Sequence, residues 1–387
     1  MTYSFDTIIE RDSTFATKTY VPHVEMGHPN SSNLWVADMD FAVCPAITEA
    51  LVKRAEHPIY GYTEEPESIK DAFREWFEKR HDIHFTNEEV VLNTGVLPAY
   101  SCAIRIISEK DDEFIVFAPT YKPFVSKLMG NGRKPVFAPL KGWEDHFVFD
   151  FEAMEALVNE KTKAVVLCNP HNPTGRVYTT EELRELAAFA QKHNRMILSD
   201  EIHCDLAYKP FHTIMDINDY TRNHTISLYS IGKTFNLAGM KMAACVIKNP
   251  ELREKFEKEA GVVGVLSLNT MGLVAFEAAY RNGSEWLDEC KAYIRHNIEW
   301  TVETFRTNFP DLHFEAGEGT YLVWIDLGAF DLQTENIQKY LLEEADVFVS
   351  AGDFFGEAYK NYIRLNMATP FANVERGVNN IIRLLKK

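Results

Sequence analysis

The stretch AVVLCNPHNPTGRVYTTEELRELAAFAQKHNRMILSDEIH, residues 164–203, decides the fold of this chain. It opens with the apolar run AVVLCN (164–169) and closes with a second run, MILSD (196–200). Between them, TTEELRELAAFAQKHN begins with a capping box at Thr179 and repeats apolar residues at helical spacing. Two strands joined by an amphipathic helix form a crossover unit. This unit predicts an α/β fold with a mostly parallel sheet.

The same alternation extends on both sides and predicts a three-layer arrangement around seven strands. The candidate strands lie at 89–93, 114–118, 135–139, 164–169, 196–200, 226–230 and 243–247. After residue 285 a long helical stretch is followed by two strand patterns, YLVWIDL and YIRLNMA, and by a final amphipathic helix. We therefore expect a large domain over 46–285 and a smaller α+β domain over 286–387. Residues 1–45 are interpreted as an arm and part of the small domain rather than a core element.

The chain has 387 residues, with 40 Lys or Arg and 57 Asp or Glu, and its formal net charge is −17. No compact stretch concentrates basic residues, so we expect no nucleic-acid partner. No apolar run approaches the roughly 20 residues of a membrane span, and the first residues lack an apolar signal core. The six cysteines show neither a CxxC pair nor zinc spacing. These features predict a cytoplasmic protein with no membrane anchor and no metal site.

A lysine and an aspartate stand at the carboxyl ends of two predicted strands, the edge where open α/β sheets bind ligands. Lys233 follows the strand ISLYS on an expected loop, and Asp200 closes the strand MILSD. Taken singly, each has an ordinary explanation, as a solvated lysine or a helix cap. Together they indicate a Schiff-base lysine beside a carboxylate that keeps a pyridine nitrogen protonated. His203, three residues after Asp200, then faces the phenolic oxygen of such a ring.

Three further positions could bind anions or orient a ligand at the same edge. The turn Asn93-Thr94-Gly95-Val96 precedes a predicted helix, and free N–H groups at a helix N-terminus favour phosphate. The rigid loop NPHNPTG (169–175) carries Asn172. Arg364, in YIRLNMA, can hold a carboxylate through two hydrogen bonds. Each of these is as readily structural as functional on its own. GxGxxG is absent from the chain, which disfavours a dinucleotide site.

As a set, the motifs NPHNPTG, SDEIH and SIGKTFN resemble the pyridoxal 5′-phosphate (PLP) enzymes of fold type I, the superfamily of aspartate aminotransferase. Within it, VADMDF (36–41), YGYT (60–63), SDEIHCD (199–205) and KTFNLAG (233–239) look like the cystathionine β-lyase branch, the MalY/PatB-type carbon–sulfur lyases. The resemblance covers nearly the whole chain. It implies PLP as the cofactor and the fold type I architecture.

The resemblance also implies a role for each matching residue. Lys233 would bind PLP as a Schiff base, Asp200 would pair with its pyridine nitrogen, and Arg364 would bind the substrate α-carboxylate. The remaining residues would surround the cofactor: Tyr121 stacks on the ring, Asn172 and His203 flank its phenolic oxygen, and Gly95, Val96, Ser230 and Lys241 bind its phosphate. Tyr62 resembles a tyrosine that reaches the phosphate of the neighbouring subunit, which implies a homodimer. Lys241 stands where aminotransferases commonly carry arginine, so the charge is kept but the fork geometry is not.

The expected activity is α,β-elimination from a cystathionine- or cysteine-type substrate, giving pyruvate, ammonia and a thiol. An aminotransferase is the alternative, because the same residues serve both reactions. VADMDF favours the lyase, since many aminotransferases of this superfamily carry a glycine-centred segment there. A third hypothesis is a regulatory binding protein with the same fold. The presence of Lys233, Asp200 and Arg364 disfavours it.

Overall fold

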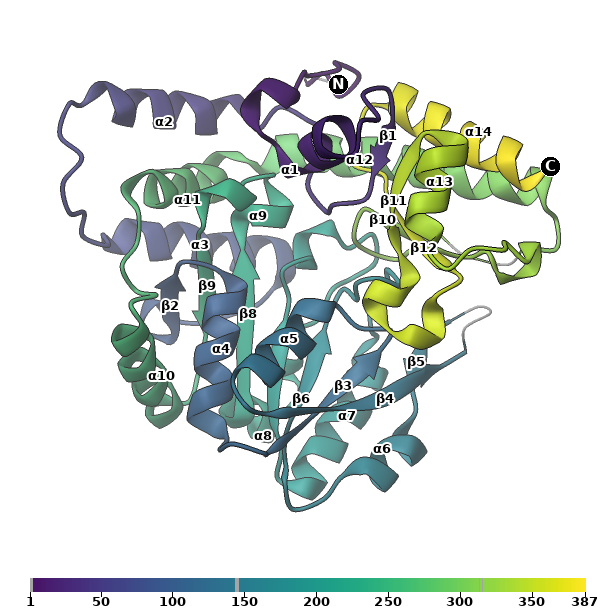
Figure 1. Cartoon of the computed structure of the whole chain (residues 1–387). Helices are drawn as coiled ribbons and strands as arrows, with labels where there is room; N and C mark the ends of the chain where they lie inside the picture. Colours follow the sequence, from purple (N-terminus) through teal and green to yellow (C-terminus); the bar gives the residue numbers. More distant parts are fainter. Residues whose placement is uncertain (1–2, 143–145, 313, 315) are drawn as a thin grey trace.

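The computed structural model describes residues 3–142, 146–312, 314 and 316–387. Two β-sheets and the helices around them form one body, with the smaller sheet beside the upper end of the larger one (Figure 1). Among the helices in these ranges, none is both long and apolar enough to cross a membrane. The helices are α1 (Thr17–Tyr20), α2 (Pro45–Glu56), α3 (Glu67–His81), α4 (Val96–Ile107), α5 (Lys122–Gly130), α6 (Phe151–Leu157), α7 (Thr180–His193), α8 (Asp219–His224), α9 (Ile231–Thr234), α10 (Pro250–Val263), α11 (Thr270–Asn282), α12 (Ser284–Asn308), α13 (Ile337–Ala345) and α14 (Phe371–Leu385).

The large sheet has eight strands in the order β2-β9-β8-β7-β6-β3-β4-β5. Its strands are β2 (Val90–Asn93), β3 (Glu113–Ala118), β4 (Lys134–Lys141), β5 (Val148–Phe149), β6 (Thr162–Cys168), β7 (Met196–Asp200), β8 (Thr225–Ser230) and β9 (Ala243–Val246). All seven strands expected from the sequence are present. The expected number of strands is one too low, because β5 pairs only two residues with β4 and is too short to show a pattern.

The sheet is mostly parallel, as expected. Strands β4, β3, β6, β7 and β8 pair in parallel, whereas β9 runs antiparallel to both of its neighbours, β8 and β2. Strands β6 and β7 are almost fully buried because helices cover both faces of the sheet. Helices α4, α5 and α10 pack on one face and α6 and α7 on the other, which gives three layers. The parallel strands therefore end together at one edge, where Asp200 and Ser230 lie.

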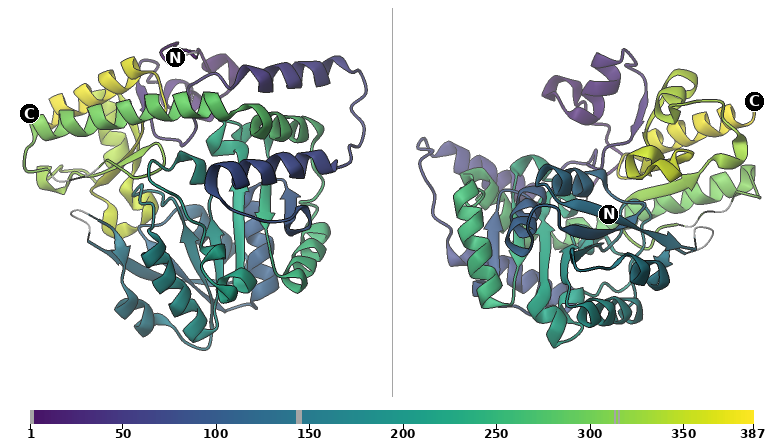
Figure 2. Two further views of the ribbon diagram at one scale, coloured as in Figure 1. Left: turned by 180° about the vertical axis from the view of Figure 1, so that it is seen from behind. Right: turned by 60° about the horizontal axis from the view of Figure 1, so that its bottom comes forward.

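The small sheet has the order β1-β11-β12-β10 and is assembled from both ends of the chain. Its strands are β1 (Ser32–Leu34), β10 (Leu322–Asp326), β11 (Val347–Ala351) and β12 (Tyr362–Asn366). Helices α13 and α14 pack against it, and α12 packs against α14 (Figure 2). The sequence predicts that residues 1–45 form an arm and part of the small domain rather than a core element. Leu34 and Phe41 of this segment are buried in the core, so the segment is more than an arm. Strand β1 has three residues, each of which pairs with a residue 315 positions later in the sequence (Ser32 with Val347), so no local pattern reveals it. The domain limits at 45 and 285 stay a prediction.

Candidate active site

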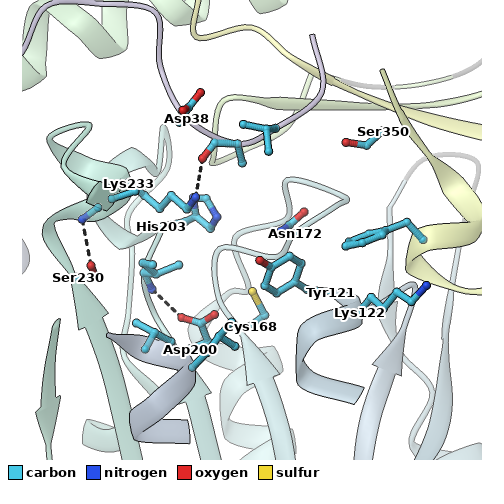
Figure 3. Close-up of a pocket in the computed structure, with 18 of the residues that line it drawn as sticks. Asp38, Tyr121, Lys122, Cys168, Asn172, Asp200, His203, Ser230, Lys233 and Ser350 are labelled. Carbon is cyan, nitrogen blue, oxygen red and sulfur yellow. Dashed lines mark hydrogen bonds between the residues drawn. The ribbon is translucent and has the colours of Figure 1, made fainter. Parts of the chain in front are cut away.

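A cavity of about 780 Å³ lies between the carboxyl edge of the large sheet and the small sheet (Figure 3). Its walls come from strand ends of both sheets and from residues 35–38, which precede helix α2. Of the eleven residues that the sequence predicts for the site, only Tyr62 does not line it. The ten that do are Gly95, Val96, Tyr121, Asn172, Asp200, His203, Ser230, Lys233, Lys241 and Arg364. Residues spread over 270 positions of sequence thus meet around one space.

Lys233 reaches into this cavity from helix α9, a single turn directly after β8. The expectation of a loop here is wrong. The Ser230 side chain accepts a hydrogen bond from the Gly232 N–H (3.0 Å) and caps the turn, which offsets the low helix propensity of glycine. The Lys233 amine donates to the Ala37 carbonyl (Figure 3). Burial lowers the pKa of Lys233 to about 8, so about a tenth of the amine is neutral at pH 7, where an ordinary lysine is almost wholly charged.

Asp200 closes strand β7, and its side chain is 6% exposed. Its Oδ1 accepts a hydrogen bond from the Ile202 N–H at 3.2 Å, and no cation forms an ion pair with it among the described residues. Burial therefore raises the pKa of Asp200 to about 7, although the Ile202 N–H and the charge of Lys233 oppose this rise. A buried carboxylate without a cationic partner is costly, and a protonated pyridine nitrogen is the kind of group that would remove the cost.

His203 and Asn172 lie beside these two groups. The His203 Nδ1 is buried without a hydrogen-bond partner among the described residues. Burial, helped by the charges of Lys233 and Arg364, lowers its pKa well below the usual value, so the imidazole is neutral. Asn172 uses its Oδ1 to accept a hydrogen bond from Arg364 at 3.0 Å. Tyr121 precedes helix α5 and contacts Phe124 edge to face, with 5.5 Å between ring centroids.

Arg364 comes from β12 and is 4% exposed. Besides its bond to Asn172, its Nη2 donates to the Trp35 carbonyl (2.9 Å) and to Ser350 Oγ (3.0 Å). Burial lowers its pKa to about 10, which leaves the guanidinium charged at neutral pH. All of these partners are uncharged, and no carboxylate pairs with Arg364 in the described part of the chain. The guanidinium is therefore oriented but not neutralised, as a substrate-carboxylate site requires.

One end of the cavity has the features of an anion site. Gly95 adopts φ +150°, a conformation that favours glycine, and it directly precedes helix α4. The first N–H groups of this twelve-residue helix have no partner within the helix, and the helix dipole adds positive potential. Lys241 lines the same cavity. Ser230 Oγ donates to the Met242 carbonyl at 2.7 Å, so here its hydrogen already has an acceptor.

Residues 35–38 also form part of the site. The sequence motif that contains most of them, VADMDF, indicates only the family and predicts no role for these residues. Their carbonyl groups accept hydrogen bonds from several side chains in and around the site. Ala37 O accepts from Lys233 and from Tyr321 OH (2.8 Å), and Trp35 O accepts from Arg364. Asn366 Nδ2 donates to the carbonyls of Val36 (2.6 Å) and Asp38 (2.7 Å). The contacts are made by backbone atoms, so no residue type in this segment signals them. The motif VADMDF was the only available hint.

Tyr62 lies on the connection between α2 and α3 and is fully exposed, together with the neighbouring Ile59 (67%) and Tyr60 (60%). It is absent from the cavity of its own chain. Three large apolar or aromatic side chains on one exposed connection are typical of a surface that another protein chain covers. The role expected for Tyr62 requires a second subunit.

The arrangement fits PLP on features of this chain alone. The helix N-terminus at Gly95 with Lys241 suits a phosphate, and the uncompensated Asp200 suits a protonated pyridine nitrogen. The unpartnered His203 Nδ1 lies buried beside the cavity, and the depressed pKa of Lys233 suits an amine that attacks a carbonyl. The individual roles stay predictions.

Comparison with known proteins gives full-length matches. A family model described as aminotransferase class I and II matches residues 30–381. Cystathionine beta-lyase PatB of Bacillus subtilis is 32% identical over 381 residues, covering 98% of this chain and 98% of that protein. Protein MalY of Escherichia coli is 30% identical over 387 residues, covering 99% of each.

Solved structures agree with these matches. Cystalysin from Treponema denticola, which contains a pyridoxal 5′-phosphate cofactor, superposes with a TM-score of 0.95 at 30% identity, covering 100% of this chain and 99% of that one. The PLP-bound C-S lyase from Staphylococcus hominis superposes with a TM-score of 0.92 at 29% identity, covering 100% and 98%.

Proposed function

Because the chain belongs to the aminotransferase class I and II family, we propose that it uses PLP to cleave the carbon–sulfur bond of cystathionine- or cysteine-type amino acids by α,β-elimination. The products are pyruvate, ammonia and a thiol. One observation carries the proposal: a single cavity brings together a lysine of depressed pKa, a buried carboxylate and a buried arginine, and neither of the last two forms an ion pair within the described part of the chain. This set suits a substrate that carries both an amine and a carboxylate.

Each of these groups has one task in the proposed reaction. When bound, PLP supplies an electron sink for the pair left on Cα after proton removal. Arg364 binds the α-carboxylate through its guanidinium and fixes which substituents of Cα face Lys233. The neutral Lys233 amine accepts the Cα proton. The bond between Cβ and sulfur then breaks, and sulfur leaves with the bonding pair as a thiolate. Hydrolysis of the remaining three-carbon fragment gives pyruvate and ammonia.

The remaining cavity residues would hold the cofactor. Asp200 keeps a proton on the pyridine nitrogen, since the pair removes the cost of its buried charge. The α4 N-terminus at Gly95 and Val96, with Lys241 and Ser230, binds the phosphate. Tyr121 covers one face of the ring, and Asn172 and His203 flank its phenolic oxygen.

We also propose that the active unit is a homodimer. The exposed connection between α2 and α3 would lie on the partner, so that Tyr62 of each subunit completes the phosphate site of the other. A cytoplasmic location is supported by the cysteines: all six lie in the described ranges, where each is buried and free.

The test separates the lyase from the aminotransferase. The PLP-loaded protein is incubated with cystathionine in the absence of any keto acid, and pyruvate is followed with lactate dehydrogenase and NADH. We expect steady pyruvate formation by the wild type and none by Lys233→Ala. Turnover that starts only when a keto acid is added would replace the lyase by the aminotransferase. No turnover of either kind would favour a regulatory binding protein.

A further inference from the structure

We propose that Asp205 and Thr234 form a positioning pair that fixes the orientation of the Lys233 amine. The proposal rests on the proposed function insofar as Lys233 is taken as the lysine that binds PLP. Asp205 and Thr234 do not line the cavity, and the reaction described above does not use them.

Asp205 is a buried carboxylate that receives three hydrogen bonds from two helices. Its Oδ1 accepts from the indole N–H of Trp76 and pairs with Nε2 of His81, both at 2.8 Å. Its Oδ2 accepts from the hydroxyl of Thr234 at 2.9 Å. Trp76 and His81 belong to α3, and Thr234 belongs to α9. The carboxylate thus joins the short helix that carries Lys233 to a helix of fifteen residues.

The carboxylate of Asp205 is ionised. Burial alone would raise its pKa, but the hydrogen bonds from His81, Trp76 and Thr234 outweigh burial, and the pKa lies below its usual value. Hydrogen bonds to a buried charge are stronger than those between neutral groups. This favours a rigid connection between α3 and α9.

A metal site is the competing interpretation of this cluster, since ligand atoms of His81, Cys204 and Asp205 lie within 4.8 Å of one another. The hydrogen bonds argue against it. Both carboxylate oxygens of Asp205 already accept hydrogen bonds from protein donors. Burial raises the pKa of the Cys204 thiol well above its usual value, so the thiol is protonated and a poor ligand.

Helix α9 depends on such outside contacts because it is a single turn and cannot hold its own orientation. Ser230 fixes its start through the Gly232 N–H and the Met242 carbonyl. Asn236, just beyond its end, bonds to the backbone of Met39 and Phe41. Thr234 directly follows Lys233 in the turn. A hydrogen bond to the Thr234 side chain therefore limits rotation of the backbone from which the Lys233 side chain extends.

Asp205 also stands five residues after Asp200 on the same segment, in the 3₁₀ turn Cys204–Leu206 that follows β7. One short stretch of chain therefore places the carboxylate proposed for the pyridine nitrogen and holds the helix of the lysine. A shift of either would alter the spacing between Lys233 and Asp200.

The test removes the Thr234 hydroxyl with little change of shape. Thr234→Val loses the bond to Asp205, Thr234→Ser keeps it, and Thr234→Ala repeats the loss without a β-branched side chain. The matched control is Thr301→Val on α12, because Thr301 is equally buried but donates to the Asn297 carbonyl of its own helix (2.8 Å). In each PLP-loaded protein we would titrate the visible absorption band with pH, measure the fraction of Lys233 trapped by borohydride, and determine kcat and KM.

We expect Thr234→Val and Thr234→Ala to shift the titration midpoint by about half a pH unit or more and to lower kcat about tenfold. The KM should stay within about twofold of wild type, since Thr234 does not contact the cavity. Thr234→Ser and Thr301→Val should match the wild type in all readouts.

The outcomes separate this proposal from the proposed function. A wild-type midpoint and kcat in folded Thr234→Val or Thr234→Ala would overturn the positioning role and leave the lyase untouched. An equal shift in Thr301→Val would also overturn it, since the effect would then be nonspecific. Absence of the visible band and of borohydride trapping in the wild type would overturn both.

Discussion

At the scale of single residues, burial moves the pKa values of the two central groups in opposite directions. It raises the pKa of Asp200 to about 7 and lowers that of Lys233 to about 8. In both cases the charged form loses hydration, so the neutral form is favoured. The protein without its cofactor therefore holds an unfavourable carboxylate, whose cost a cationic ring nitrogen would offset.

The first prediction concerns that cost in the cofactor-free protein. The folded pKa of Asp200 lies above its ordinary value of 3.8, so the folded state binds the proton more tightly than the unfolded state. The destabilisation by Asp200 is thus absent below about pH 3.8, grows as the pH rises to about 7, and is constant above it. Asp200→Asn removes it and still accepts the Ile202 N–H. We expect a gain of about 2–4 kcal/mol in the free energy of unfolding at pH 8.

Urea denaturation of the cofactor-free wild type and Asp200→Asn between pH 5 and pH 8 measures this effect. The gap between the two proteins should widen from pH 5 to pH 7 and then stay level. A gap of equal size at pH 5 and pH 8 would show that the carboxylate does not titrate in this range. With PLP added, the order should reverse, because the asparagine offers no negative charge to the ring nitrogen.

A second prediction at this scale concerns Arg364→Lys. Lysine keeps the charge but lacks the planar fork that is now oriented by Asn172, Ser350 and the Trp35 carbonyl. We expect kcat/KM for cystathionine to fall about 100-fold, mainly through a higher KM. Steady-state pyruvate assays measure it. Arg184→Lys, at an exposed position of α7, is the control and should be unchanged. An unaltered KM would remove Arg364 from carboxylate binding.

At the scale of elements, the sequence predicts those that carry enough local signal. The crossover helix α7 and the strands on either side of it lie where the capping box and the apolar runs place them. The elements that the sequence did not predict are short. Strands β1 and β5 form through pairing with a neighbouring strand, and α9 is stabilised by a capping residue. Periodicity needs several residues to become visible, and these elements do not supply them.

The third prediction tests the capping box. Thr179 Oγ1 accepts from the Glu182 N–H at 3.2 Å, and Glu182 bonds back to the Thr179 N–H at 2.7 Å. Thr179→Ala leaves one N–H of the first turn of α7 without its partner. We expect a loss of about 1 kcal/mol in the free energy of unfolding with kcat unchanged. Urea denaturation and the pyruvate assay measure the two quantities. A fall in kcat of the same protein would tie this helix end to the active site.

At the scale of the whole molecule, the active site exists only because two sheets meet. The large sheet supplies Asp200, the turn α9 that follows its strand β8 supplies Lys233, and the small sheet supplies Arg364. The net charge of −17 does not argue against anion binding at the α4 N-terminus or at Arg364. Acidic groups on the outer surface are screened by salt and have little effect on the potential between the two sheets. Tyr62 lies outside this cavity, which motivates the proposed dimer.

The fourth prediction tests a site shared between subunits. Lys233→Ala lacks the amine but keeps Tyr62, and Tyr62→Ala keeps the amine. In a mixed dimer, one of the two sites contains an intact Lys233 and an intact Tyr62 from the other chain. We expect an activity well above the mean of the two separate variants after the chains are unfolded and refolded together. Additive activity, or a monomer in sedimentation equilibrium, would place Tyr62 outside the site.

The sequence by itself determined the α/β class, the crossover units, the family resemblance and ten of the residues that line the cavity. It could do so because strand ends, helix starts and motifs are local properties of the chain. Only the tertiary structure decided that the Ala37 carbonyl accepts a hydrogen bond from the Lys233 amine, that Ser32–Leu34 are the residues that pair with β11, and that Asp205 connects α3 to α9. These are contacts between distant segments. They arise from how layers pack and which buried polar groups find partners, and neither leaves a periodic trace in the amino-acid order.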